Sequence, residues 1–65
     1  MKRNKGDKVV IKNNLEVNKK YGKWAFTSDM EKFKGKEATI CYVGEDYYSL
    51  KGIYCSWTDE MLEDE

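Results

Sequence analysis

The chain has 65 residues, of which 40% are hydrophobic, 14% aromatic and 37% charged. A chain of this length forms one domain and buries only roughly 60% of the surface that its unfolded form exposes. The composition excludes an intrinsically disordered chain. No uncharged stretch is longer than residues 38–44, which excludes a membrane-spanning helix, since such a helix needs about 20 apolar residues. We therefore expect a single domain over residues 1–65 in the cytoplasm, since no apolar segment follows the basic start as in a secretory signal.

Charge is divided unevenly along the chain. Residues 1–36 hold eleven of the twelve basic residues and four acids, whereas residues 37–65 hold one base and eight acids. The two halves thus carry +7 and −7, and the formal net charge is zero. A zero total argues against a chain that mainly coats phosphate, because such binding requires an uncompensated basic surface. We expect the halves to fold onto each other, with residues 1–5 as a basic tail and residues 63–65 as an acidic tail.

The first predicted strand covers residues 8–12, a β-branched run that follows a turn signal at Gly6-Asp7. The connection after it, residues 13–27, is longer than most loops of compact domains, which indicates structure of its own. Apolar and polar residues alternate near both of its ends, and residues 18–22 between them are turn-forming. The connection is therefore predicted to be an irregular hairpin that presents aromatic rings and lysines.

A short helix is predicted in the middle of the chain. Ser28 and Glu31 have the S-x-x-E spacing of a capping box, and Met30 and Phe33 share one helical face. Gly35 supplies a stop. The helix is expected to be one or two turns long and to close one end of the fold, with Met30 and Phe33 as core residues.

Three further strands are predicted at residues 37–43, 47–51 and 53–57, joined by short turns that contain glycine. Strict alternation breaks between Ile40 and Val43, which indicates a β-bulge that helps a small sheet to curl. The predicted fold class is therefore mainly β: a small barrel with one short helix in the middle and a short helical turn at the C-terminus.

The C-terminal helical turn is predicted from Thr58 as its N-cap and from the carboxylates of Asp59 and Glu60. Met61 and Leu62 are expected to fold back onto the core. Paired carboxylates are also the ligand type of a divalent ion. Capping and solvation account for Asp59-Glu60 and likewise for Glu45-Asp46, so no metal site is predicted.

The inventory of side chains argues against catalysis and against a cofactor. The chain has no histidine, so the usual general base near neutral pH is missing, and neither Cys41 nor Cys55 has a base to activate it. Two thiols without histidine are also too few ligands for a structural zinc site. The chain is therefore expected not to be an enzyme. The cysteines are interpreted as partly buried free thiols, with a disulfide between paired strands as the alternative.

Aromatic residues are the richest functional signal, because nine of them are too many for so small a core to enclose. Alternation assigns five residues to the core: Phe26, Phe33, Tyr48, Leu50 and Trp57. Other rings and nearby lysines form the predicted binding set: Lys20, Tyr21, Lys23, Trp24, Tyr47, Lys51 and Tyr54. Such rings stack on a nucleobase while ammonium groups meet a phosphate, or they form a protein-binding hot spot, and composition leaves both interpretations open.

Four segments carry a resemblance to a known group of proteins. They are Gly6-Asp7-Lys8-Val9-Val10-Ile11, Tyr21-Gly22-x-Trp24-x-Phe26, Met30-Glu31-x-Phe33-x-Gly35-Lys36 and Trp57-Thr58-Asp59-Glu60-Met61. Over nearly its whole length the chain resembles the small SH3-like barrel proteins of phages and mobile elements of Firmicutes. The resemblance implies an SH3-like barrel and a phage setting, and it transfers no catalytic residue. Cys55 departs from the aromatic or polar residue expected at its position.

The expected function is that of a non-enzymatic, phage-encoded binding protein that neutralises a component of host immunity in the host cell cytoplasm. It would block a defence protein or sequester a small nucleotide signal. The second route requires a concave site, which we expect only in a homo-oligomer because a monomer of this size offers little concavity. The alternatives are a nucleic-acid-binding accessory domain, against which the acidic C-terminal half counts, and a structural phage component.

Overall fold

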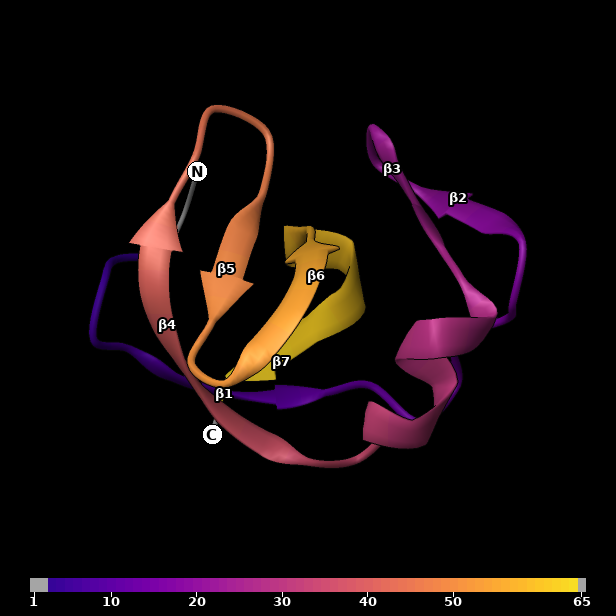
Figure 1. Cartoon of the computed structure of the whole chain (residues 1–65), viewed down its shortest axis with the longest axis horizontal. Helices are drawn as coiled ribbons and strands as arrows, with labels where there is room; N and C mark the ends of the chain where they lie inside the picture. The colour runs from indigo at the N-terminus through magenta and orange to yellow at the C-terminus, as the bar shows by residue number, and fades with distance from the viewer. Residues whose placement is uncertain (1–2, 65) are drawn as a thin grey trace.

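The computed structural model describes residues 3–64 and has the mainly β fold that the sequence predicts (Figure 1). Its strands are β1 (Lys8–Ile11), β2 (Lys19–Tyr21), β3 (Trp24–Phe26), β4 (Glu37–Val43), β5 (Tyr48–Leu50), β6 (Ile53–Trp57) and β7 (Leu62–Asp64). Two 3-10 turns, η1 (Ser28–Phe33) and η2 (Asp59–Met61), stand where the short helix and the C-terminal turn were predicted, and residues 3–64 contain no α-helix. Within that range no helix is long and apolar enough to cross a membrane.

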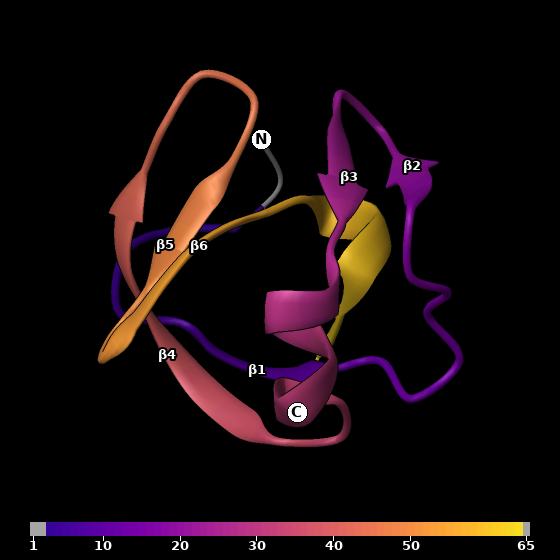
Figure 2. The same ribbon diagram turned by 45° about the vertical axis from the view of Figure 1, so that its right-hand side comes forward.

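Five strands form an antiparallel sheet in the order β6-β5-β4-β1-β7, and β2 and β3 form a separate two-stranded sheet. The first half of β4 pairs with β1 and its second half with β5, across a register shift between Ile40 and Tyr42. This shift is the predicted β-bulge, and β4 curves through it from one half of the sheet to the other, as Figure 2 shows.

The sheets do not close into a barrel, and the prediction of a closed barrel is wrong on this point. The edge strands β6 and β7 pair with no further strand among the described residues. They are joined through η2 rather than by a ladder of hydrogen bonds, and the β2–β3 hairpin remains a sheet of its own. A sequence pattern indicates which residues form strands, but not whether two edge strands meet within hydrogen-bonding distance.

The core draws side chains from almost every element: Val9, Ile11, Leu15, Phe26, Met30, Ile40, Tyr48, Leu50, Trp57, Met61 and Leu62. Trp57 is fully buried, and the rings of Phe26 and Phe33 are edge-on to it at centroid distances of 6.3 Å. Burial of a large apolar side chain contributes roughly 1.5–3 kcal/mol. Four of the five predicted core residues are buried, whereas Phe33 is half-buried at the margin.

Two local predictions around the hairpin are wrong. Residues 18–22 are not all turn: residues 19–21 form β2, because their backbone pairs with β3 although their side chains are mostly polar. The N-cap of η1 is also Thr27 rather than Ser28. The Thr27 N–H donates to Sδ of Met30 at 3.4 Å, and its carbonyl accepts the Met30 N–H at 3.0 Å, so the predicted Ser28–Glu31 capping box does not form.

The two charged ends of the chain belong to the fold as far as they are described. Glu63 and Asp64, expected in an acidic tail, pair with Val10 and Val9 in the β1–β7 ladder. Backbone hydrogen bonds make this ladder, so charged side chains do not prevent it. Arg3 of the expected basic tail forms ion pairs with Asp59 and Asp64. Residues 1, 2 and 65 of these tails lie outside the described residues.

Candidate functional site

A groove of about 820 Å³ lies on the β4–β5–β6 part of the large sheet and reaches the β2–β3 hairpin. Its aromatic residues are Trp24, Tyr42, Tyr47 and Tyr54, and we call it the aromatic groove. Five small residues also line it: Cys41, Ser49, Gly52, Cys55 and Ser56. Lys51 is the single charged residue among the described residues of its lining, which therefore includes no carboxylate.

Strand alternation explains why these side chains face outward. In β5, Tyr48 and Leu50 are buried, so Ser49 between them lies on the outer face. In β6, Trp57 is buried, so Ser56 and the fully exposed Tyr54 lie on that same outer face. In β4, the bulge leaves Cys41 and Tyr42 both exposed, although they are consecutive.

The hairpin and the β4–β5 loop form one end of the groove together. The rings of Trp24 and Tyr47 meet edge to face with centroids 5.7 Å apart, and Tyr42 lies beyond Tyr47 at 6.1 Å. Lys23 at the hairpin turn forms an ion pair with Asp46 at 3.3 Å. The Tyr47 ring rests on Gly44, where a Cβ would overlap it. Glycine at position 44 is therefore needed for this arrangement of the wall.

Three of the groove's rings are exposed to an extent that is uncommon for large hydrophobic side chains. Trp24 is 41% exposed, Tyr42 55% and Tyr54 102%. Tryptophan and tyrosine are enriched among residues that dominate binding energies, because their large rings carry a polar group. A cluster of such rings in one groove indicates a binding surface.

The structure brings four of the seven predicted binding residues together. Trp24, Tyr47, Lys51 and Tyr54 line the groove, and Lys23 adjoins it through Asp46. Two others, Lys20 and Tyr21, do not line it.

Tyr21 is a structural residue of the hairpin rather than a surface residue of the groove. Its ring is half-buried against the core, and its hydroxyl accepts a hydrogen bond from the Glu16 N–H at 2.8 Å. Lys19 Nζ lies 5.5 Å from the centroid of that ring. Sequence reasoning also missed Tyr42 and Cys41, although the predicted bulge was a signal for an extra outward residue in β4.

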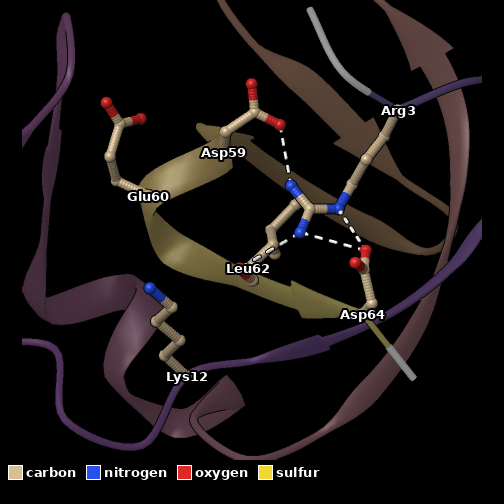
Figure 3. Close-up of a pocket in the computed structure, with 6 residues that line it drawn as sticks. All are labelled: Arg3, Lys12, Asp59, Glu60, Leu62 and Asp64. Carbon is tan, nitrogen blue, oxygen red and sulfur yellow. Dashed lines mark hydrogen bonds and ion pairs between the residues drawn. The ribbon is translucent and has the colours of Figure 1, made fainter.

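A second hollow, of about 540 Å³, lies beside η2 and β7 and is lined by Arg3, Lys12, Asp59, Glu60, Leu62 and Asp64 (Figure 3). The Arg3 side chain, only 13% exposed, lies 2.7 Å from Asp59 Oδ1 and 3.2 Å from Asp64 Oδ1. Its Nη2 also donates to the Leu62 carbonyl at 3.4 Å. The guanidinium is thus engaged by the fold itself, and this hollow is a structural clamp rather than a ligand site.

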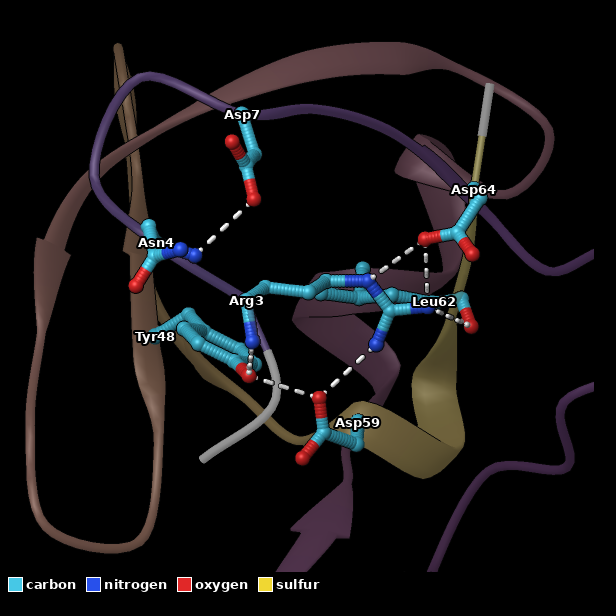
Figure 4. A network of polar contacts seen from close by, with 7 residues as sticks. All are labelled: Arg3, Asn4, Asp7, Tyr48, Asp59, Leu62 and Asp64. Carbon is cyan, nitrogen blue, oxygen red and sulfur yellow. Dashed lines mark hydrogen bonds and ion pairs between the residues drawn. The ribbon is translucent and has the colours of Figure 1, made fainter.

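The buried Tyr48 belongs to the same clamp (Figure 4). Its hydroxyl accepts the backbone N–H of Arg3 at 2.8 Å and donates to Asp59 Oδ1 at 2.6 Å. Burial, and then the hydrogen bond to Asp59, raise the pKa of Tyr48 above 10.0. The network fixes the start of the chain against the centre of the fold.

The two cysteines are free thiols, so no disulfide joins β4 and β6. Cys41 is exposed on the groove and Cys55 is half-buried. Burial, and then the charge of Asp29, raise the pKa of the Cys55 thiol. A raised pKa makes Cys55 a poor nucleophile. Within residues 3–64, no three acidic or cysteine side chains gather as metal ligands would.

Comparisons with known proteins found no match to this chain among protein-family models, curated proteins or solved structures. The functional argument therefore rests on the geometry of the aromatic groove.

Proposed function

We propose that this chain is a non-enzymatic binding protein that holds its partner in the aromatic groove. The observation that carries the proposal is the gathering of the exposed Trp24, Tyr42 and Tyr54 in one groove with Tyr47 and Lys51. Leaving such rings in water forgoes the burial that would stabilise so small a domain. Binding a partner recovers that burial.

An SH3-like architecture is part of this proposal. The strand order β7-β1-β4-β5-β6, the long connection between β1 and β4 that holds the β2–β3 hairpin, and the 3-10 turn before the last strand support it. The open edge between β6 and β7 means that the relation is one of strand order rather than of full closure. Folds of this class host many functions, so the groove and not the fold carries the functional argument.

A protein is the partner that the groove fits best. Its rings are spread over β3, β4, the β4–β5 loop and β6, which is the spread of an interface rather than of a closed ligand cavity. A stable complex would bury at least about 1,000 Å². In the phage setting implied by the resemblance, the partner is a host defence protein, and occupying its surface neutralises it.

A small nucleotide is the second candidate, and the size of the groove favours it. The volume of about 820 Å³ lies in the range of small-molecule sites, roughly 300–1,000 Å³. The single chain thus has the concavity that we expected only from an oligomer. Stacking on the rings and a contact from Lys51 to phosphate would hold such a ligand.

The experiment compares three proteins: the unaltered chain, the double variant Tyr42→Ser/Tyr54→Ser, and the control variant Lys8→Ser, which changes an exposed residue of β1 outside the groove. Each is immobilised, and proteins retained from host lysate are quantified by mass spectrometry and then purified for affinity measurement. The proposal expects one partner whose affinity falls about tenfold or more in the double variant and is unchanged in the control. Equal binding to all three proteins would show that the groove is not the site.

The nucleotide candidate is tested by titrating a panel of mono-, di- and cyclic nucleotides while tryptophan fluorescence is recorded. Trp57 is fully buried and Trp24 is exposed in the groove, so a change in emission reports Trp24. A saturable change that the double variant loses supports the nucleotide. If no nucleotide changes the emission and a protein is captured through the groove, the partner is a protein.

A further inference from the structure

Both neighbours of β5, the middle strand of the aromatic groove, are irregular at the level of Ser49. In β4, Cys41 is the extra residue between two successive pairs with β5. In β6, residues 54–56 lie opposite Ser49 alone, because the register shifts there. Bulges bend a strand, re-aim its side chains and are over-represented next to functional sites. Two of them at one level indicate that the sheet is shaped for a ligand around Ser49.

The polar groups of the groove gather at this level. Ser49 is half-buried on the outer face of β5, Ser56 belongs to the β6 segment opposite it, and Lys51 follows in the turn after β5. Lys51 is exposed and forms no ion pair with another described residue, whereas Lys23 at the hairpin turn is paired with Asp46. Two hydroxyls and one ammonium, with no carboxylate among the described lining residues, make a site for an anion.

We propose that the aromatic groove binds an extended segment of a partner protein through a central aspartate or glutamate, whose carboxylate is held by Lys51, Ser49 and Ser56. The rings of Tyr42 on β4 and Tyr54 on β6 stand on the two sides of β5 and take the apolar side chains that flank this acid. The inference rests on the proposed function and names the chemistry that the groove selects.

The charge of the site favours a carboxylate over a phosphate monoester. The described lining residues include one ammonium, that of Lys51, and no guanidinium. A phosphate monoester carries about −1.5 to −2 charges at pH 7, and proteins hold it with clusters of arginine. A single lysine balances the single charge of an aspartate or glutamate, and the two serine hydroxyls donate the further hydrogen bonds that a carboxylate accepts.

The rings favour a protein segment over a free small acid. Trp24, Tyr42 and Tyr54 come from β3, β4 and β6, so ring surface lies on both sides of Ser49 in a groove of about 820 Å³. A carboxylate alone would leave that surface in water. Apolar or proline side chains next to the acid in an extended segment cover it, as in other aromatic-lined peptide grooves. The occupant is therefore acidic in its middle and apolar at its flanks.

Peptide selection tests this chemistry directly. A displayed library of random peptides is selected on the immobilised chain, and peptides that the Tyr42→Ser/Tyr54→Ser variant also retains are discarded. The remaining peptides are expected to share an aspartate or glutamate beside an aromatic residue or proline. The best of them is then synthesised with the acid, with the matching amide, and with phosphoserine at that position. The acid peptide should bind about tenfold or more tighter than the amide peptide in calorimetry.

Variants of the chain assign the acid to its contacts. Lys51→Gln should lower the affinity for the acid peptide about tenfold and leave that for the amide peptide unchanged, while Lys51→Arg keeps the preference. Ser49→Ala should lower the affinity for the acid peptide about fivefold. The matched control Lys20→Gln removes an exposed lysine outside the groove and should change neither affinity. Circular dichroism checks that each variant is folded.

The outcomes distinguish this inference from the proposed function. Equal affinities for the acid and amide peptides, or an acid preference that survives Lys51→Gln, would overturn the carboxylate site, while ring-dependent binding would still support the proposed function. Tighter binding of the phosphoserine peptide would assign the site to phosphate and would also overturn the inference. A selection that yields no peptide whose binding depends on Tyr42 and Tyr54 would count against both.

Discussion

The indole ring of Trp24 and the phenol ring of Tyr47 meet edge to face at a centroid distance of 5.7 Å, and this contact joins the two sheets of the molecule. The neighbouring Lys23–Asp46 ion pair is exposed, with side chains 75% and 40% accessible. Such pairs contribute little because water and salt screen them. The ring contact, worth about 0.5–1.5 kcal/mol beyond its burial, therefore contributes more than this ion pair to holding the tip of the hairpin at the groove.

Replacing Trp24 by alanine is expected to separate binding from stability. The free energy of unfolding should fall by only about 1 kcal/mol, because the ring is 41% exposed, while groove-dependent affinity falls about tenfold or more. Urea denaturation and a binding titration on the same preparation measure the two quantities. Global unfolding of the variant would show that Trp24 is a core residue.

Gly44→Ala is expected to displace the Tyr47 ring, since the added Cβ would overlap it. The chemical shifts of Tyr47 and Trp24 should change and partner affinity should fall, while the buried Trp57 keeps its signal. The matched control is Gly6→Ala, outside the groove: nothing lies within 4 Å of a Cβ there, but φ is +95°. The control should cost about 1 kcal/mol of stability through backbone strain and leave the groove unchanged. Unaltered Tyr47 shifts in Gly44→Ala would contradict the close approach.

Tyr48→Phe removes a buried hydroxyl that both accepts and donates, so the free energy of unfolding should fall by about 1–3 kcal/mol. The loss should also depend on pH. Because the folded-state pKa of Tyr48 is raised, folding favours the protonated hydroxyl. The stability that this hydroxyl contributes is fully present below pH 10.0 and is lost as the pH rises through the folded-state pKa. The stability difference between the unaltered chain and the variant should therefore narrow above about pH 10. A stability difference that stays constant above pH 10 would show that ionisation of Tyr48 is not linked to unfolding.

Arg3→Ala is expected to destabilise the fold by about 1–3 kcal/mol, since it leaves Asp59 and Asp64 without their guanidinium in a partly buried clamp. Lys5→Ala, at an exposed position of the same segment, is the control and should change stability by less than about 0.5 kcal/mol. Thermal unfolding of the three proteins provides the measurement. Equal melting temperatures would mean that Arg3 does not anchor the chain in solution.

The two thiols should react at different rates with a soluble alkylating reagent. Cys41 is exposed, whereas burial raises the pKa of Cys55 and lowers its thiolate fraction at pH 8. Intact-mass spectrometry should show a first adduct at Cys41, with Cys55 modified later and faster as pH increases. Faster modification of Cys55 at pH 8 would contradict its half-buried placement.

Much of the fold could be predicted from local sequence patterns. The predicted strands 37–43 and 53–57 match β4 and β6 to the residue, because alternation and flanking turn residues define them. The bulge near Ile40 was visible as a break in that alternation. β2 and β7 were not predicted as strands, since their side chains are polar or acidic and only the pairing of their backbones makes them strands.

The candidate site was predictable only in part, for a related reason. Composition showed that some rings must lie outside the core, and four of the predicted binding residues, Trp24, Tyr47, Lys51 and Tyr54, line one groove in the structure. Tyr42 was missed, because its outward direction depends on how the bulge is resolved in space. Tyr21, which belongs to the same predicted set, lies outside the groove, and only the folded hairpin brings the Glu16 N–H to its hydroxyl.

The sequence by itself determined the β class, the turns and the larger part of the core, because these follow from the short-range periodicity of apolar residues and from the conformational preferences of glycine and β-branched residues. Only the tertiary structure decided that the sheet stays open at β6 and β7, that Arg3 reaches Asp59, and that rings from β3, β4 and β6 share one groove. These are relations between segments far apart in the chain. They depend on the twist and bend of the sheet, which no local pattern encodes.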